Sequence, residues 1–573
     1  MNSYFKRFLL IPISICLLGA NLSFNYEDNM CNTHFAKSLK KENELVIYNC
    51  ADYIDETLIE EFEEEFNCEV HYYTYDTNET MYNQFTLQPK GTYDLICTSD
   101  YMIQKMVREG LVEPINISQE IPEYDKYASK EVRGKLASMY ADVDGDGIKE
   151  ASLDNYSVGY MWGTLGIVYD PICSDTIEDD VKSWDIFWNT KYKNLISIKN
   201  SMRDTFVVGL MHAYKGSSIS GLEDVLTPAR QTFLDAIEKA TSEDEKRQIR
   251  NDYNKIIQDI FDLVITQEDY ESILEIVKNE LISLKKNIFG FEVDSGKNDI
   301  ITGKIKMNLA WSGDAVYSID TALEEANKVL HYSVPEDGAN VWYDGWTLPN
   351  GSNRDLACEF VDFLSRPENA ARNMDYIGYT SFISCDEVFD LVSETYGVSE
   401  YFEETSYHGA YYDEEEEEDI EGSIVLYEDK IYRCIKDGEF DVLNILPTNA
   451  DYWEEVDEDL GISDTPYDLN YLFSSDDTTR DYILYPYEIY ENKLETQYPT
   501  QDTLARCAIM NDFGSVNEYV VIMWGQLRAY TSMTPYYVIL ISFATGVLVV
   551  ALLLTIKKHN SIRSQRRKMK KQG

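Results

Sequence analysis

The chain has few histidines and lacks the common sequence motifs of enzyme active sites. Its 573 residues include six histidines, which occur in no metal-ligand or catalytic-triad arrangement. A Gly-x-Ser-x-Gly nucleophile motif and a phosphate-binding glycine loop are absent. We therefore expect a protein that is not an enzyme and that needs no cofactor.

Cysteine is present but follows no pattern of known function. The ten cysteines are scattered, and none forms a Cys-x-x-Cys pair or a zinc-binding spacing. An extracellular location would permit disulfides, although the spacing favours no particular pairing. We expect most of these residues to act as small buried hydrophobic side chains.

Basic residues are few compared with acidic ones. The chain has 50 Lys and Arg residues against 102 Asp and Glu residues, a formal net charge of -52 at pH 7. Because like charges repel, this balance excludes nucleic acid as a partner of the main body and favours a small cation. The acidic run Asp413–Asp419 is predicted to be a solvated loop.

Two apolar segments flank this acidic body. Residues 1–24 carry Lys6 and Arg7 ahead of an apolar core. They predict a signal peptide or an uncleaved anchor, since neither an Ala-x-Ala site nor a lipobox cysteine follows. Residues 536–556 are long and apolar enough for a transmembrane helix. By the positive-inside rule the basic tail 557–573 is cytoplasmic, so the protein is expected in the cell membrane with its acidic domain extracellular.

Strand and helix signals alternate after residue 42. Leu45–Tyr48 is predicted to be a buried strand, and the alternation continues to Gly110. The apolar residues of the first predicted helix fall on one face: Leu58, Ile59, Phe62 and Phe66. This alternation predicts an α/β fold with a largely parallel sheet. Ligands bind beyond the carboxyl ends of such strands, where Cys50–Tyr53 and Ser99–Tyr101 lie.

Two stretches interrupt the alternation. Residues 222–284 have a helical period and predict two or three surface helices, whereas 411–462 combine an acidic loop with a small all-β insertion. In the insertion, Tyr427, Tyr432 and Trp453 are placed like the aromatic residues of short chitin- or cellulose-binding modules. Such residues either form the core of a small domain or present a glycan-binding surface. A membrane-anchored adhesion or glycan-binding protein is therefore an alternative function.

A short acidic segment resembles the start of a calcium loop. Asp142-Val-Asp-Gly-Asp-Gly147 matches the opening of an EF-hand, but Leu153 stands where the loop needs Glu. The segment is either a turn or a weak calcium site formed by Asp142, Asp144 and Asp146.

Four stretches place an aromatic ring beside a hydroxyl or a carboxylate. They are Tyr48–Tyr53, Ser99–Tyr101, Trp311–Asp314 and Trp342–Asp344. Carboxylates pair with ammonium groups, and ring faces accept both cationic heads and the methylenes between them. If the fold brings these stretches together, the ligand that suits them is a polyamine.

These stretches and several others resemble the spermidine/putrescine-binding component of polyamine ABC transporters. The strongest match runs through Tyr75-Asp-Thr-Asn-Glu-Thr-Met-Tyr82, and further matches include Ser201–Asp204, Ile377–Tyr379 and Arg506–Gly514. The resemblance implies a two-lobed, type II periplasmic-binding-protein-like fold. In it each lobe is a mixed, mostly parallel sheet flanked by helices. It also implies partners, namely spermidine or putrescine, a permease and, through it, an ATPase.

By position in that family, lobe 1 would comprise 42–163 and 339–400, and lobe 2 would comprise 164–338 and 466–528. The resemblance further implies a set of ligand contacts. The family's aromatic box corresponds to Tyr53, Tyr101, Trp311 and Trp342, with a hydroxyl contact from Ser99 and amine-binding acids at Asp204 and Asp344.

Three positions depart from the family pattern. Cys50 replaces a tryptophan of the box, Ser201 stands where an acidic residue is found, and Met510 replaces an amide. Asp100 and Asp314 adjoin the matched positions and are expected to add negative charge. With one ring and one carboxylate fewer, the resemblance leaves open which polyamine binds. A weaker site, a shorter amine or a shifted binding pose would each fit.

Overall fold

A computed structural model describes most of the chain between its ends. The described residues are 43–143, 150–266, 270–293, 295–413, 418–436, 442–456 and 459–530, together with Thr545 and Lys557. The predicted leader 1–24, the rest of the predicted transmembrane helix 536–556 and the rest of the basic tail lie outside these residues. No helix within the described ranges is long and apolar enough to cross a membrane.

A 12-stranded mixed sheet forms the centre of the fold, in the order β2-β1-β3-β12-β7-β10-β8-β9. These strands are β1 (Glu44–Cys50), β2 (Glu69–Tyr75), β3 (Leu95–Ser99), β7 (Ser157–Tyr169), β8 (Ile196–Lys199), β9 (Gly290–Glu292), β10 (Met307–Trp311) and β12 (Ala339–Pro349). Four short strands pair with β7 or β12: β4 (Val112–Glu113), β11 (His331–Ser333), β13 (Thr380–Ser381) and β22 (Cys507–Ala508).

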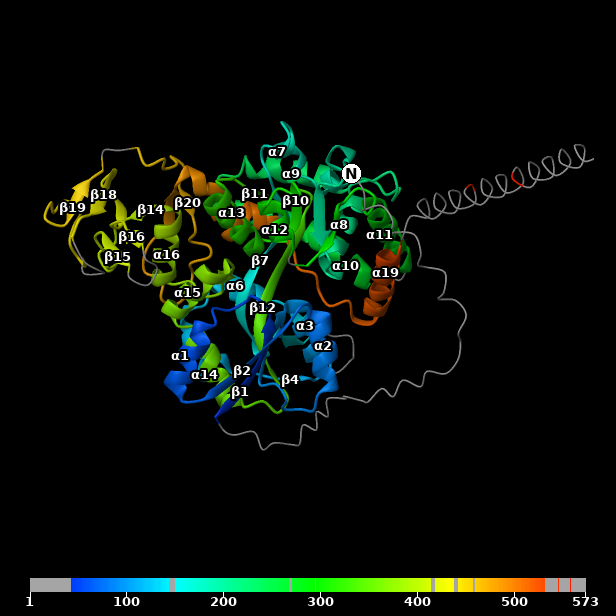
Figure 1. Cartoon of the computed structure of the whole chain (residues 1–573), viewed down its shortest axis with the longest axis horizontal. Helices are drawn as coiled ribbons and strands as arrows, with labels where there is room; N and C mark the ends of the chain where they lie inside the picture. The colour runs from blue at the N-terminus through cyan, green and yellow to red at the C-terminus, as the bar shows by residue number, and fades with distance from the viewer. Residues whose placement is uncertain are drawn as a thin grey trace, which may run out of the picture. The chain divides into compact units, whose positions relative to one another are not determined.

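Strand β7 changes partner along its length and so divides this sheet into two halves. Its residues 157–164 pair with β12, and its residues 165–169 pair with β10. Figure 1 shows β7 and β12 running from the part that carries β1 and β2 to the part that carries β10 and β11. We call these parts lobe 1 and lobe 2. The change of partner falls between residues 164 and 165. The residue boundaries of the two lobes given in the sequence analysis remain predictions.

Lobe 1 follows the predicted α/β alternation. Strands β1 and β2 are parallel, as are β1 and β3. Leu58 and Phe62 of the first helix are fully buried, as its periodicity predicts. The helices of this region are α1 (Thr57–Phe66), α2 (Asn78–Leu87), α3 (Asp100–Arg108), α4 (Ile117–Glu120), α5 (Pro122–Tyr127), α6 (Lys130–Ala137), α14 (Arg354–Leu364), α15 (Pro367–Ile377) and α16 (Asp386–Tyr396). The hairpin β5 (Tyr140–Ala141) and β6 (Ala151–Ser152) follows α6.

Lobe 2 includes the predicted helical stretch. Its helices are α7 (Ile177–Asp180), α8 (Met202–Tyr214), α9 (Leu226–Ile237), α10 (Glu243–Thr266), α11 (Tyr270–Leu284), α12 (Ser295–Ile301), α13 (Ser312–Ala326), α17 (Glu491–Gln497), α18 (Gln501–Ala505) and α19 (Asn517–Ala529). Unlike purely surface helices, α10 and α11 bury Ile257 and Val277 completely. A Cβ atom on Gly209 of α8 would lie 2.8 Å from the Leu281 side chain, so this glycine lets α11 pack closely.

Lys285, just after α11, holds the end of α19. Its Nζ atom donates hydrogen bonds to the carbonyl oxygens of Leu527, Arg528 and Tyr530, at 2.9, 3.0 and 2.8 Å. The last carbonyls of a helix have no partner within the helix, and a cation beside them also interacts favourably with the helix dipole. The lysine therefore fastens the last described helix to lobe 2.

A separate six-stranded sheet has the order β19-β18-β17-β14-β21-β20. Its strands are β14 (Gly397–Glu400), β17 (Ile424–Tyr427), β18 (Lys430–Cys434), β19 (Trp453–Glu455), β20 (Tyr467–Asp468) and β21 (Ile483–Pro486), and β15 (Tyr411–Asp413) pairs with β16 (Glu418–Ile420) beside it. This sheet extends beyond the predicted insertion 411–462. The reason is that β17 pairs with β14, which pairs in turn with β21.

The aromatic residues of the insertion serve mainly its core. Trp453 is only 1% exposed, packs edge-on against Tyr407 and donates from Nε1 to the carbonyl of Ile445 at 2.9 Å. Tyr427 and Tyr432 are partly buried and face each other edge-on. Of the two readings of these rings, the structure thus favours a core role for Trp453.

Candidate ligand-binding site

All twelve predicted ligand-site residues line one cavity of about 370 Å³. They are Cys50, Tyr53, Ser99, Asp100, Tyr101, Ser201, Asp204, Trp311, Asp314, Trp342, Asp344 and Met510. Residues of both lobes contribute, so the cavity lies between them. The fold thus brings together residues that are up to 460 positions apart in the sequence, from Cys50 to Met510.

The cavity is built at the carboxyl ends of strands, where open α/β sheets bind their ligands. Cys50 ends β1, Ser99 ends β3, Lys199 ends β8 and Trp311 ends β10. Helices α3 and α13 start immediately after β3 and β10, and two residues separate α8 from β8. Ser201 caps α8, because its hydroxyl accepts a hydrogen bond from the amide of Asp204 at 3.4 Å.

Asp344 comes from an irregular point of β12. Between Tyr343 and Gly345 the pairing with β7 shifts register, so two β7 residues face this single aspartate. Such bulges redirect side chains and are frequent beside functional sites. Tyr53 donates a hydrogen bond from its hydroxyl to Asp344 Oδ2 at 2.8 Å, whereas the buried Oδ1 has no hydrogen-bond partner among the described residues.

Burial raises the pKa of several carboxyl groups in the cavity. It raises the pKa of Asp344 to about 6, although the nearby hydroxyls of Ser99 and Tyr53 favour the charged form and the charge of Asp204 disfavours it. Burial likewise raises the pKa of Asp100 to about 7, against the opposing effects of Arg203 and two backbone amides. The pKa of Asp204 is also raised by burial, and Ser201 and Lys199 offset part of the rise. A cationic ligand would stabilise the charged forms of these carboxylates.

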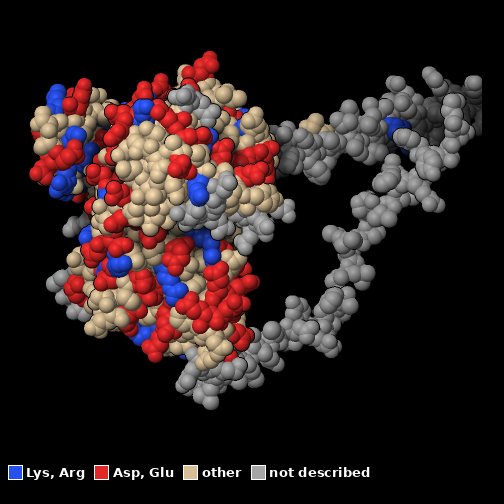
Figure 2. All heavy atoms as spheres, turned by 90° about the vertical axis from the view of Figure 1, so that its left-hand side faces the viewer, with Lys and Arg blue, Asp and Glu red and all other residues tan. Residues whose placement is uncertain are grey.

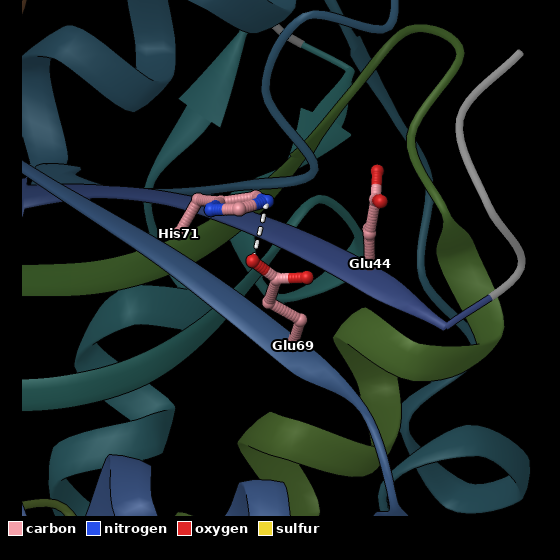
Figure 3. Close-up of side chains that lie close together, drawn as sticks. All are labelled: Glu44, Glu69 and His71. Carbon is pink, nitrogen blue, oxygen red and sulfur yellow. Dashed lines mark ion pairs between the residues drawn. The ribbon is translucent and has the colours of Figure 1, made fainter. Parts of the chain in front are cut away.

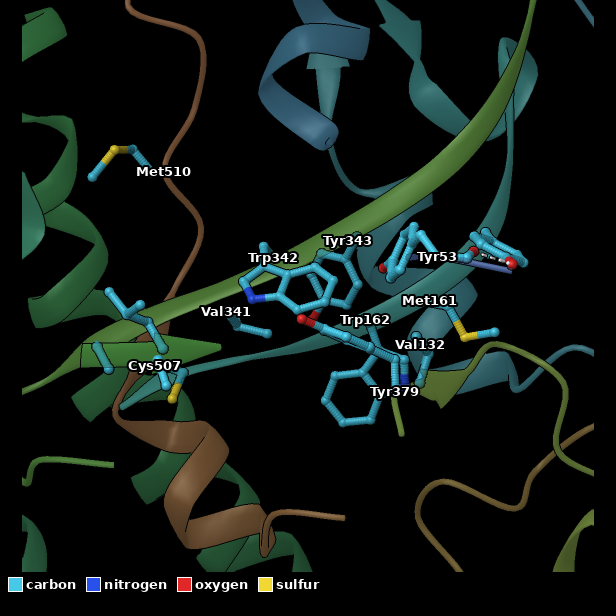
Figure 4. Close-up of a cluster of buried hydrophobic side chains, with 14 of the residues drawn as sticks. Tyr53, Val132, Met161, Trp162, Val341, Trp342, Tyr343, Tyr379, Cys507 and Met510 are labelled. Atoms are coloured by element: carbon cyan, nitrogen blue, oxygen red, sulfur yellow. Dashed lines mark hydrogen bonds between the residues drawn. The ribbon is translucent and has the colours of Figure 1, made fainter. Parts of the chain in front are cut away.

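Three rings form a continuous aromatic wall. The Tyr53 ring meets Tyr379 edge-on at a centroid distance of 5.1 Å, and Tyr379 meets Trp342 at 5.6 Å (Figure 4). Glycines leave room for them, since a Cβ on Gly313 would lie 2.2 Å from the Tyr379 ring and one on Gly163 would lie 2.8 Å from Trp342. The Trp311-Ser-Gly-Asp314 motif therefore contributes space as well as a ring and an acid.

The cavity also contains positive side chains that the sequence analysis missed. Lys199 Nζ lies 4.3 Å from the centre of the Trp311 ring and 2.8 Å from Asp314 Oδ2. The Arg203 guanidinium lies 3.8 Å from the centre of the Tyr101 ring and donates to the carbonyl oxygens of Met510 and Asn511. Arg203 stands inside the matched segment Ser201–Asp204, but no local signal marks Lys199.

These contacts change the expected role of Asp314. Although burial disfavours its charge, Lys199 and Lys297 hold the pKa of this carboxyl below its usual range. Tyr379 also donates a hydrogen bond to Oδ1 at 3.1 Å. Asp314 lines the cavity as expected, yet its charge is already balanced. Tyr379 was itself missed as a site residue, although Ile377–Tyr379 was recognised as a matching segment.

A second group of acids and one histidine lies at the start of β1 and β2, away from the cavity. Figure 3 shows Glu44, Glu69 and His71, and His71 Nε2 lies 3.9 Å from Glu69 Oε1. Ligand atoms of the three are within 4.8 Å of one another. They are at least partly exposed, as in an ordinary surface ion pair. Of the predicted calcium residues, only Asp142 belongs to the described part of the chain.

A two-lobed α/β fold with two connecting strands and a cavity between the lobes is the architecture of solute-binding proteins. The family model of the bacterial extracellular solute-binding protein matches residues 57–385, more than half of the chain. The chain belongs to this family. It is therefore a binding protein of an extracellular class, as the sequence analysis predicted.

Individual relatives are similar over more than half of the chain. The spermidine/putrescine-binding periplasmic protein of Escherichia coli is 24% identical over 342 residues, which cover 59% of this chain and 77% of that protein. The putrescine-binding periplasmic protein PotF of the same organism is 26% identical over 346 residues, covering 60% and 78%. A solved structure described as a putative spermidine/putrescine ABC transporter from Listeria monocytogenes has a TM-score of 0.50 at 21% identity. It covers 85% of this chain and 100% of that one. This likeness supports the fold.

Proposed function

We propose that the protein captures a polyamine outside the cell and delivers it to the permease of an ABC transporter. The observation that carries this proposal is Asp344. It is a cavity carboxylate whose buried Oδ1 has no hydrogen-bond partner among the described residues, and it lies beside the aromatic wall of Tyr53, Tyr379 and Trp342. An ammonium group would satisfy the carboxylate, and the ring faces suit both the cation and its methylenes. The names of the relatives agree with a polyamine ligand.

Exclusion of water is the main source of affinity in this mechanism. An ion pair exposed to solvent contributes only about 0–1 kcal/mol. Between the two lobes, however, the effective dielectric falls and both charge–charge and cation–π contacts strengthen. The ligand would thus hold the lobes together, since its ammonium groups contact residues from both of them.

The surface charge supports attraction of a cation toward the cleft. Figure 2 shows Asp and Glu side chains over much of one face, with Lys and Arg side chains interspersed. The net charge of -52 would draw polyamines from solution over distances of the order of the Debye length, about 8–10 Å at physiological salt.

The partners proposed are a permease with its ATPase, and the membrane. The hydrophobic segment 536–556, followed by a basic tail, would hold the binding protein near its transporter. Tethering raises the local concentration of the protein without new contacts. A permease needs several membrane-spanning segments, so this chain would not transport the polyamine alone.

Replacement of the central carboxylate tests the proposal. Asp344→Asn keeps the shape of the side chain but removes its charge, so we expect putrescine and spermidine affinity to fall about tenfold or more. Isothermal titration calorimetry measures the change. Asp320→Asn is a matched control, because Asp320 is a partly buried aspartate that pairs with Lys493 outside the cavity. Unchanged affinity in Asp344→Asn would refute the proposed site, and no binding of either amine by the wild type would refute the function.

A further inference from the structure

One group of cavity residues already contains its own ammonium ions. Lys199 Nζ lies 2.8 Å from Asp314 Oδ2 and 3.5 Å from Glu292 Oε1, and it covers the face of Trp311. Lys297 places a second ammonium 3.6 Å from Asp314 Oδ1. We call these five residues the lysine cluster. Its arrangement of a ring face, a carboxylate and an ammonium is the one expected for a bound amine.

The lysine cluster leaves no net charge for a ligand. Among the described residues, its two lysines balance its two carboxylates, and the Lys199 side chain is 1% exposed. A ligand ammonium at Asp314 would have to displace a buried lysine or lie beside it, and like charges repel strongly in a low-dielectric site. This part of the cavity is therefore closed to a further cation.

Two other cavity carboxylates have no such partner. Neither Asp344 nor Asp204 forms an ion pair within 4.0 Å with any Lys or Arg in the described part of the chain. They are close enough for the charge of Asp204 to raise the pKa of Asp344. Ser201 adds no charge nearby, because a serine hydroxyl is neutral, and this one caps α8. Asp344 and Asp204 thus offer two carboxylates that have no ion-pair partner among the described residues, although Lys199 favours the charged form of Asp204 from a greater distance. The cluster offers no such carboxylate.

Acids at the lobe 1 edge of the cavity do not offer a further ligand ammonium a binding position in place of the lysine cluster. Asp52 and Asp76 also line the cavity but are exposed. Exposed ion pairs are weak because water and salt screen them. Glu79 accepts a hydrogen bond from the Tyr101 hydroxyl at 3.0 Å and is partly buried. An additional ligand ammonium at this edge would gain little.

We infer that Lys199 sets the length of the ligand. The cleft takes a short diamine, with one ammonium at Asp344 and the other at Asp204. It discriminates against a triamine because Lys199 already occupies the ring face and carboxylate that a further ammonium would need. This inference rests on the proposed polyamine function and names the ligand within that class.

Competing titrations of two amines test the inference. We expect the wild-type protein to bind 1,4-diaminobutane (putrescine) at least about tenfold more tightly than spermidine. In Lys199→Ala, the Trp311 face loses its cation and Asp314 loses the nearer of its two lysines, so an ammonium of spermidine can take the place of Lys199. We expect the preference for putrescine to fall about tenfold or more, and spermidine to raise the melting temperature of this variant more than putrescine does.

Lys215→Ala is the matched control. Lys215 is also a lobe 2 lysine between two carboxylates, 3.1 Å from Asp337 and 3.2 Å from Asp185, but it does not line the cavity. Its replacement should lower the melting temperature without changing the ratio of the two affinities. Lys199→Met retains more of the side-chain volume and replaces the alanine variant if that variant does not fold.

Each outcome decides one question. Equal or tighter binding of spermidine by the wild type would overturn the inference, as would an unchanged affinity ratio in both Lys199 variants. If the wild type binds neither amine, the proposed function fails and not merely the assignment of length.

Discussion

The carboxylates that line the cavity fall into two kinds, according to whether the protein supplies their counter-ion. Asp314 has Lys199 and Lys297 beside it, and its pKa lies below the usual range despite burial. Asp344 accepts a hydrogen bond from the Tyr53 hydroxyl but has no Lys or Arg within ion-pair distance among the described residues, and burial raises its pKa to about 6. A ligand cation stabilises the second kind far more, because the first is already compensated.

This difference predicts how polyamine binding depends on pH. As the pH falls through about 6, the ligand-free protein protonates Asp344 and a cation must displace that proton. The amines themselves stay charged throughout, so affinity should decrease by up to about tenfold per pH unit between pH 6 and pH 5. Calorimetry of putrescine binding at pH 8, 6 and 5, in buffers of different ionisation enthalpy, would record both the loss of affinity and the protons released.

The raised pKa of Asp344 affects the stability of the ligand-free protein in the opposite direction: affinity falls as the pH falls, whereas stability falls as the pH rises. Between the ordinary aspartate value of about 3.9 and the folded value of about 6, the folded state binds more protons than the unfolded state. The contribution of Asp344 to stability therefore decreases as the pH rises through this interval. Asp344→Asn should remove this pH-dependent contribution to stability. If putrescine affinity in Asp344→Asn changed with pH as it does in the wild type, the pH dependence of binding could not be assigned to Asp344.

Residue types and local motifs indicated many of the acidic and aromatic residues that line the cavity, but not its lysines. Trp342, Asp344 and Ser99 could be recognised because each stands in a short segment with its neighbours. Lys199 could not, because its partner Asp314 is 115 positions away and only the parallel pairing of β8 with β10 brings their ends together. A lysine at the end of a strand has no distinctive pattern in the sequence.

At the scale of secondary-structure elements, amphipathic periodicity predicted the helices well. The first predicted helix has its buried residues where the pattern placed them, and α9, α10 and α11 occupy the helical stretch 222–284. The six-stranded sheet was harder to predict. Strands β14, β20 and β21 have only two to four residues each and lie outside residues 411–462, where the sequence indicated β structure.

The extent of this sheet affects how its role is tested. Deletion of 411–462 would remove β17, β18 and β19 and expose the edge of β14. A point substitution is cleaner. We expect Trp453→Ala to destabilise this sheet by about 3–5 kcal/mol, because it removes a large fully buried ring.

Polyamine affinity should remain unchanged in Trp453→Ala, since Trp453 packs in a hydrophobic cluster separate from the main core and does not line the cavity. Urea unfolding followed by circular dichroism, together with calorimetry, would measure both properties. A large loss of affinity would show that the six-stranded sheet supports the ligand site.

At the scale of the whole molecule, the charge imbalance predicts a strong salt effect on association. A net charge of -52 attracts a divalent amine at long range, whereas the contacts inside the cavity are largely shielded from salt. Raising NaCl from about 20 to about 500 mM should therefore lower the association rate about tenfold or more and change the dissociation rate much less. Stopped-flow tryptophan fluorescence is suited to this measurement, because Trp311 and Trp342 line the cavity. A salt effect confined to dissociation would contradict long-range steering.

The contact between Lys285 and the end of α19 has a mechanical consequence. Any force transmitted along the chain from beyond Tyr530 reaches the folded body at the point where this lysine binds three carbonyl oxygens. Lys285 directly follows α11 of lobe 2, so part of this load reaches lobe 2 without passing through β7 and β12, the two strands that join the lobes. If the segment beyond Tyr530 anchors the protein as proposed, lobe 2 would stay fixed and lobe 1 would move relative to it. Replacing Lys285 would then weaken the attachment of α19 to lobe 2 without altering β7 or β12.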